Sequence, residues 1–184
     1  MISRDESLAL LDKYLTDEKL LKHSYAVEAI MRAMAITLKE DEELWGLTGL
    51  LHDLDFDYTR SEPDKHANMT ADILQELVPE SMIDAIKGHN YRHTSHVPTT
   101  SLDKALIAAD ALSGLIIASA LVMPSKKLKE VKVKTLRDKF KDTSFARGCD
   151  RKKIGLCVDV GLEVRPFLSL GLKALKKIHT PLGL

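Results

Sequence analysis

The stretch Leu50-Leu51-His52-Asp53 places a histidine and an aspartate directly after an apolar run that begins near Leu44. Its pattern predicts a buried helix over about residues 42–54. An imidazole and a carboxylate beside buried leucines are costly to desolvate unless another group pairs with them. A divalent metal is one such partner. If a metal is present, its other ligands must come from core-facing positions elsewhere in the chain.

The composition favours a single helical domain over residues 1–184. Hydrophobic residues make up 45% of the chain and charged residues 29%, an ordinary balance for a soluble protein with a hydrophobic core. Aromatic residues are only 5%, whereas leucine, alanine, isoleucine and lysine are plentiful, which favours helices over sheets. We therefore expect an all-α fold.

The positive charges gather in one part of the chain, although the formal net charge is zero. Residues 126–153 contain twelve lysines and arginines against four acidic residues. This segment could hold an anion, or it could be a solvated basic face. Because few aromatic side chains lie nearby for stacking on bases, we expect no nucleic-acid partner.

The sequence gives no sign of export or of a membrane partner. Cys149 and Cys157 match neither a zinc pair nor a secreted disulfide framework, and residues 2–6 are too polar for a signal peptide. Residues 105–123 are apolar enough to approach a spanning helix, but Asp110 in their middle argues for a buried central helix instead. We expect a cytoplasmic protein.

Helical periodicity assigns two buried ligand candidates on separate helices. The helix predicted for residues 17–39 has the apolar stripe Leu20, His23, Val27, Ile30 and Met34, so His23 faces the core. The helix predicted for residues 101–123 places Asp110 on a similarly dry face. A hydrogen-bonded core histidine and a carboxylate that caps a neighbouring helix are the alternatives to metal ligation.

Three further histidines belong to the segment between these helices. His66 lies in the first turn of a helix predicted for residues 64–77, after a loop over residues 55–63. A short helix over residues 81–88 points His89, and then His93, to its inner side. The set His23, His52, Asp53, His66, His89 and Asp110 is large enough for two metals about 3.5–4 Å apart. Such mixed donors suit iron, manganese, nickel, cobalt or zinc.

The order His23, His52-Asp53 and Asp110 resembles the HD superfamily of metal-dependent phosphohydrolases, and within it a group of small predicted hydrolases. The resemblance covers about residues 18–121, which leaves a helical basic extension over residues 122–184. It implies a helical bundle with a metal held between helices by these four residues, Asp53 bridging to a second ion. By the pattern of two-metal members, His66 and His89 would hold that second metal.

The chain departs from the family pattern directly after the His-Asp pair. Many members continue with Ile-Gly-Lys, and that lysine approaches a substrate phosphate, whereas this sequence reads Leu54-Asp55-Phe56. The Gly-Tyr-Pro motif of cyclic-dinucleotide enzymes is also missing, which argues against such a substrate. The phosphate contact must then come from elsewhere, and Lys126 and Arg147 in the basic segment are the candidates.

The resemblance implies hydrolysis of a small phosphate ester, with a nucleotide expected, by attack of a metal-bound hydroxide. Asp53 would orient the nucleophile and His93 would protonate the leaving oxygen. One branch of the superfamily uses a similar ligand set as a di-iron oxygenase, and a non-catalytic nucleotide-binding module is a further alternative. The small phosphorylated substrate is the expected partner, and the sequence leaves a homo-oligomer open.

Overall fold

The computed structural model describes residues 1–184, which form helices joined by turns and loops, with no β-strand. The all-α prediction is therefore confirmed. In chain order the helices are α1 (Arg4–Tyr14), α2 (Glu18–Leu38), α3 (Glu42–Leu51), α4 (Phe56–Thr59), α5 (Asn68–Leu74), α6 (Glu80–His89), α7 (Ser101–Leu121), the 3₁₀ helix η1 (Leu128–Glu130), α8 (Val133–Lys141), α9 (Arg151–Gly155), the 3₁₀ helix η2 (Leu156–Val160), α10 (Val164–Lys177) and α11 (His179–Leu182).

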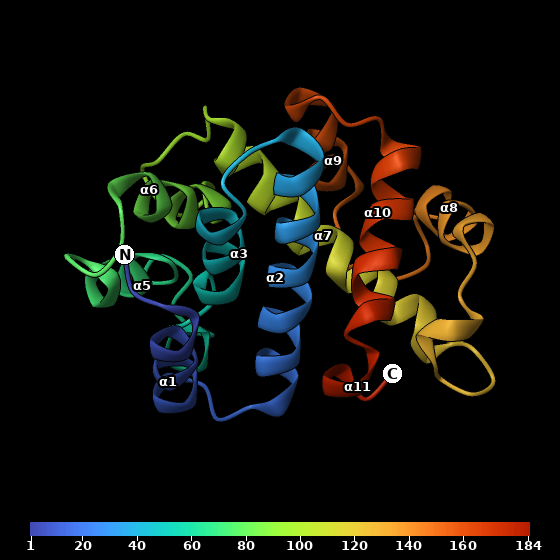
Figure 1. The fold of residues 1–184 in the computed structure, drawn as a ribbon, viewed down its shortest axis with the longest axis horizontal. Helices are drawn as coiled ribbons and strands as arrows, with labels where there is room; N and C mark the ends of the chain where they lie inside the picture. The colour runs from blue at the N-terminus through green and yellow to red at the C-terminus, as the bar shows by residue number, and fades with distance from the viewer.

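Helices α2 and α7, of 21 residues each, form the centre of the fold. Helix α2 packs against α3, α7 and α10, and α7 also packs against α6, α9 and η2. Figure 1 shows α2 between α3 and α10, with α7 passing behind them. These two central helices therefore connect the N-terminal and C-terminal parts of the chain.

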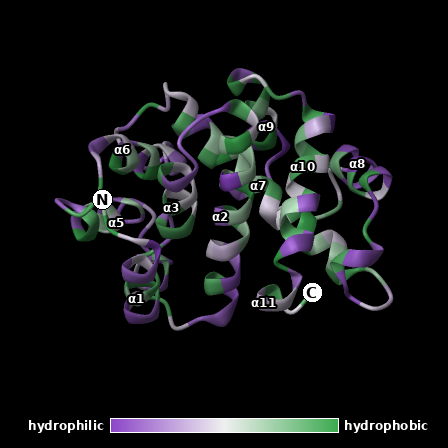
Figure 2. Cartoon of the chain, in the orientation of Figure 1, coloured by the Kyte–Doolittle hydropathy of each residue, from purple (hydrophilic) through white to green (hydrophobic).

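One hydrophobic core joins all parts of the molecule. A cluster of 41 buried residues extends from Leu11 in α1 to Leu182 in α11, and it includes Leu136 in α8 and Leu168 in α10. Figure 2 shows hydrophilic residues gathered on peripheral helices such as α1 and α8. The buried residues of the basic C-terminal segment thus belong to the same cluster as those of the N-terminal part.

Side-chain caps fix where the two central helices begin. Asp17 caps α2 by accepting a hydrogen bond from the backbone N–H of Lys19 at 2.9 Å. Helix α7 begins with a capping box, in which Thr100 and Asp103 each accept the other's backbone N–H. Reciprocal caps of this kind satisfy N–H groups that a helix start leaves without partners.

Helix α7 is the one helix long and apolar enough to cross a membrane by length and composition. Within its most apolar window, 67% of the residues are buried inside the protein. Its apolar side chains pack against neighbouring helices, which is the arrangement expected of a central helix.

The segment between α3 and α6 differs from the prediction. Residues 55–63, predicted as a loop, contain α4, and the helix predicted for residues 64–77 is confined to α5. Ala67 and Glu76 have φ angles of 71° and 67°, left-handed values that a continuous right-handed helix does not contain. His66 therefore lies in a turn before α5, and the helix α3 ends just before His52.

Candidate metal centre

Six side chains converge from five segments of the chain. His23 comes from α2, His52 and Asp53 follow α3, His66 precedes α5, His89 ends α6, and Asp110 lies in the middle of α7. Two groups of donor atoms are close enough for metal ligation, namely His23, His52 and Asp53, and Asp53, His66 and His89. The structure thus brings together all six residues that the sequence predicted as ligands.

Close packing of α3 on α2 brings the first two histidines together. A Cβ atom on Gly49 would lie 2.9 Å from Met31 Cγ and 3.0 Å from the carbonyl oxygen of Val27. Only a residue without a side chain allows this approach of the two helices. It places His52 so that its Nε2 atom is 3.3 Å from Nε2 of His23.

Asp53 is the centre of the cluster. Its Oδ1 atom lies 3.4 Å from Nε2 of both His52 and His66, and 3.3 Å from Nε2 of His89. Its Oδ2 atom lies 3.5 Å from Nε2 of His23. The side chain is nearly buried, with a relative exposure of 11%. One carboxylate therefore faces both donor groups, which is the arrangement of a bridging ligand.

The separations between donor atoms fit bound metal ions. An ion about 2.0–2.2 Å from each ligand holds neighbouring ligand atoms about 3.0–3.5 Å apart. The Nε2 atoms of His66 and His89 are 3.0 Å apart, and Asp110 Oδ1 lies 3.2 Å from Nε2 of His23. The side chains present therefore have the donor types and the spacing that a transition metal requires.

Backbone carbonyls orient two of the four histidines. Nδ1 of His52 donates a hydrogen bond to the carbonyl oxygen of Gly49 at 2.9 Å, and Nδ1 of His89 donates to that of Ile86. Each acceptor lies three residues before its histidine, so the turn of the helix itself supplies it. These bonds fix the proton on Nδ1 and leave Nε2 as a lone-pair donor.

Side chains orient the other two histidines. Nδ1 of His66 donates to Asp55 Oδ1 at 2.8 Å, and Nδ1 of His23 donates to Ser113 Oγ at 3.1 Å. The Ser113 hydroxyl gives its own proton to the Asp110 carbonyl oxygen at 2.8 Å, so it can only accept from His23. With Nδ1 of each ring directed at its acceptor, the four Nε2 atoms face the cluster and are the atoms that would bind a metal.

Sequence reasoning missed Asp55, the partner of His66. Asp55 is fully buried, and its Oδ2 atom accepts the backbone N–H of Thr70 at 2.9 Å. The sequence placed it in a loop and weighed Phe56 only as a lost phosphate contact. The available signal was a second carboxylate two residues after Asp53 in an otherwise apolar stretch, where an acid needs a buried partner.

Opposing effects set the pKa values of the donors. Burial disfavours the charged form of His23, but the Asp110 carboxylate outweighs burial and raises the pKa of His23, so a metal would compete with a proton at this ring. Burial lowers the pKa of His52 to about 4, so this imidazole is neutral at neutral pH. Burial opposes ionisation of Asp110, but the His23 imidazole lowers the pKa of Asp110 to about 2. In the same way His52 and His89 hold the pKa of Asp53 well below its usual range despite burial. Both carboxylates are therefore charged acceptors.

Three predicted functional residues lie away from the cluster. Nδ1 of His93 pairs with Asp64 at 3.4 Å, and the His93 side chain is 44% exposed. Lys126, in the turn after α7, and Arg147, in the turn before α9, are both exposed. None of the three lines the cavity that reaches the cluster, so their catalytic and substrate-binding roles stay predictions.

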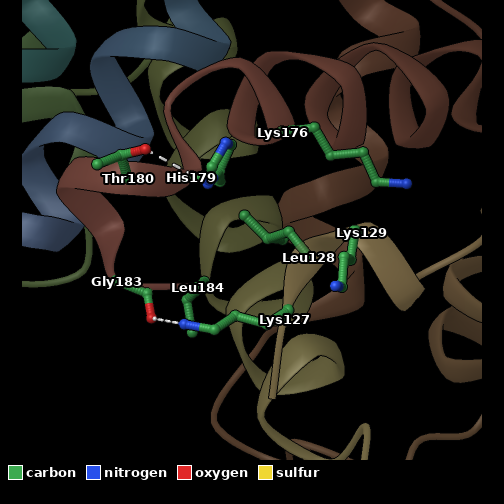
Figure 3. A pocket seen from close by; sticks show the side chains of 8 residues that line it. All are labelled: Lys127, Leu128, Lys129, Lys176, His179, Thr180, Gly183 and Leu184. Atoms are coloured by element: carbon green, nitrogen blue, oxygen red, sulfur yellow. Dashed lines mark hydrogen bonds between the residues drawn. The ribbon is translucent and has the colours of Figure 1, made fainter. Parts of the chain in front are cut away.

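Two cavities differ sharply in chemistry. A cavity of about 290 Å³ reaches His23 and Asp110 of the cluster. A larger cavity of about 540 Å³ lies between η1 and the C-terminal helices, and its lining includes Lys127, Lys129, Lys176 and one histidine, His179 (Figure 3). No carboxylate side chain lines this larger cavity. Only the smaller cavity therefore leads to a set of metal donors.

Comparison with known proteins identifies a family. The family model of the HD domain matches residues 20–115, a region that contains all six donor residues. No curated protein and no solved structure shows a significant match to the chain. HD domains bind divalent metals through histidines and aspartates of this kind. Because the matched region is more than half of the 184 residues and carries the complete donor set, the chain belongs to the HD domain family.

Proposed function

We propose that this HD protein is a metal-dependent phosphohydrolase that cleaves a small phosphate ester, with a nucleotide as the expected substrate. The two donor groups that share Asp53 carry the proposal. HD domains are generally metal-dependent hydrolases. When bound, one or two ions of iron, manganese, nickel, cobalt or zinc supply a Lewis acid that stabilises phosphoryl charge and lowers the pKa of water.

The chain's own residues have distinct tasks in this proposal. His23, His52 and Asp110 would hold one ion with Asp53, and His66 and His89 would hold a second with the same carboxylate. The fixed Nδ1–H groups keep each ring oriented without rearrangement. This arrangement provides a rigid, largely dehydrated donor set at the inner end of the cavity.

The reaction adds water across the ester bond. The oxygen of water attacks phosphorus, the bond between phosphorus and the ester oxygen breaks, and a proton of the water passes to the leaving alcohol. Asp53 stays ionised because its pKa is held low by His52 and His89 against the effect of burial. Its carboxylate can therefore accept a hydrogen bond from the attacking water and direct the oxygen lone pair toward phosphorus.

A cytoplasmic location belongs to the same proposal. Cys149 and Cys157 form no disulfide, as expected in a reducing compartment. Burial raises the pKa of the Cys157 thiol to about 11, so this cysteine is a protonated core residue and not a metal ligand.

Metal content tests the proposal directly. We would measure metal per chain by elemental analysis on protein prepared without chelators or a histidine tag, beside the variants Asp53→Asn and Asp64→Asn. We expect close to two ions per chain, lost in Asp53→Asn. They should be kept in Asp64→Asn, because the Asp64 side chain is 89% exposed and outside both donor groups. The metal-loaded protein should then release phosphate from a panel of nucleotides.

Three outcomes would contradict the phosphohydrolase. Protein that takes up no manganese, iron or nickel has no metal centre. Iron-loaded protein that consumes oxygen with an organic substrate and releases no phosphate would be an oxygenase. Tight nucleotide binding without turnover, in the presence of each metal, would indicate a non-catalytic module.

A further inference from the structure

The cavity that reaches the metal centre is formed by two distant parts of the chain. His23 and Asp110 line its inner part, and Arg92, in the turn after α6, lines it as well. Another lining residue, Lys153 in α9, lies outside residues 20–115 that match the HD domain. Figure 1 shows α9 against α7, so the C-terminal segment supplies one wall of the cavity.

Lys153 is the one charged residue of the cavity wall without an ion-pair partner, beside Arg92, Asp110 and Asp150. Its half-buried ammonium group has no carboxylate partner and no hydrogen bond, and Nζ lies 6.0 Å from the Tyr91 ring centroid. Arg92 lies 3.1 Å from Asp150 Oδ2, and Asp150 Oδ1 accepts the backbone N–H of Lys152 at 2.8 Å. The outer carboxylate is therefore already occupied, whereas the ammonium group beside it is free to bind an anion.

The wall that carries Lys153 is held in place before any ligand arrives. The guanidinium of Arg151 donates hydrogen bonds to the backbone carbonyls of Lys139, Phe140, Asp142, Phe145, Ala146 and Cys149. On the facing side, a Cβ atom on Gly114 of α7 would lie 3.0 Å from Cys149 Sγ. Close packing and the hydrogen bonds of the half-buried Arg151 thus fix this loop over the cavity, so an anion would meet a preformed site.

We propose that Lys153 and Arg92 bind the phosphoryl group of the substrate and that the cavity selects phosphomonoesters over phosphodiesters. This inference rests on the proposed hydrolase function. A monoester presents three unsubstituted oxygens and up to two negative charges, whereas a diester presents two oxygens and one charge. An ammonium and a guanidinium group together match the more highly charged monoester.

The size of the cavity supports the same selectivity. Its volume of about 290 Å³ falls just below the range of roughly 300–1,000 Å³ typical of small-molecule sites. With a phosphoryl group between Lys153 and the metal ligands, a diester would have to place two ester substituents in the remaining volume or in solvent. A monoester needs room for only one.

Phosphate binding tests the role of Lys153 independently of turnover. We would titrate the metal-loaded protein with inorganic phosphate by calorimetry, comparing Lys153→Met with Lys152→Met. Lys152 is an exposed neighbour in α9 that does not line the cavity. We expect Lys153→Met to weaken phosphate binding about tenfold or more, and Lys152→Met to change it by less than about twofold. Lys153→Arg keeps the charge and should restore most of the affinity.

Hydrolysis of two model esters tests the selectivity. We expect a higher kcat/KM for p-nitrophenyl phosphate than for bis(p-nitrophenyl) phosphate, and a raised KM for the monoester in Lys153→Met. Equal phosphate affinity in the Met variants at residues 152 and 153 would overturn the phosphate site, and a preference for the diester would overturn the selectivity. If neither ester is cleaved but phosphate binding still depends on Lys153, the hydrolase proposal fails while the phosphate site stands.

Discussion

Replacing Asp55 with asparagine should release the second metal more than the first. Asp55 Oδ1 accepts the Nδ1–H of His66 at 2.8 Å, and Oδ2 accepts the backbone N–H of Thr70 at 2.9 Å. Both carboxylate oxygens are thus acceptors, and the residue is fully buried. An asparagine of the same shape would have to direct its NH₂ group at one of these two donors.

Either orientation of the amide has a measurable cost. If the NH₂ group faces Thr70, a buried N–H loses its acceptor, which costs about 1–3 kcal/mol of folding free energy. If it faces His66, the proton moves from Nδ1 to Nε2, and the lone pair that would bind metal is lost. Loss of a carboxylate that orients a ligating histidine typically lowers metal affinity about 10–100-fold.

Metal titration and unfolding measure these two costs separately. Zinc or manganese affinity would be measured by competition with a chelating dye, and the free energy of unfolding by urea denaturation of metal-free protein. Asp57→Asn is the matched control, because Asp57 accepts hydrogen bonds from the backbone N–H groups of Thr16 and Asp17 and does not contact His66. Two metals bound with unchanged affinity in Asp55→Asn would refute the proposed role of this carboxylate.

Two further predictions concern the packing and the charge of the cluster. Gly49→Ala should destabilise the protein by about 1–3 kcal/mol in urea denaturation, because the added Cβ would lie 2.9 Å from a side chain of α2. Gly148→Ala, with no atom within 4 Å of its Cβ, should be close to neutral, and equal effects would contradict the packing argument. In metal-free protein, burial raises the pKa of Asp110 but pairing with His23 lowers it further, from 3.8 to about 2. The ionised Asp110 therefore stabilises the folded protein above about pH 4, and this stabilisation is lost as the pH falls from about 4 to 2. Asp110→Asn should flatten that part of a stability profile measured by urea denaturation between pH 2 and 6, and an unchanged profile would count against the ion pair.

The inner part of the metal centre could be predicted from the sequence because it is built on long helices. His23 and Asp110 each occupy one position of an apolar stripe, and the periodicity of 3.6 residues fixes which face of the helix they share. His52 and Asp53 follow an apolar run whose burial is equally clear. Local periodicity is sufficient for these residues because the helices that carry them are continuous and buried.

Positions in turns were harder to predict because their direction depends on backbone angles that periodicity does not contain. His66 was expected in a first helical turn, but the left-handed φ of 71° at Ala67 places it in a separate turn. The hydrogen bond to Asp55 orients the His66 ring there, whereas the helical spacing of side chains in α5 does not determine its direction. The resemblance to the HD family had named His66 as a ligand, whereas nothing in the local pattern named Asp55.

The basic segment shows why counting charges does not indicate which cation lines a cavity. The sequence predicts Lys126 and Arg147 as phosphate contacts because they are cationic and near loops, and both are exposed residues outside the cavity lining. Arg151, in the same segment, uses its guanidinium on six backbone carbonyls, which organises the cavity wall. Two residues later, Lys153 has no internal partner and lines the cavity. A positive charge is most available for a substrate where the fold leaves it unpaired, and that depends on tertiary contacts that composition does not record.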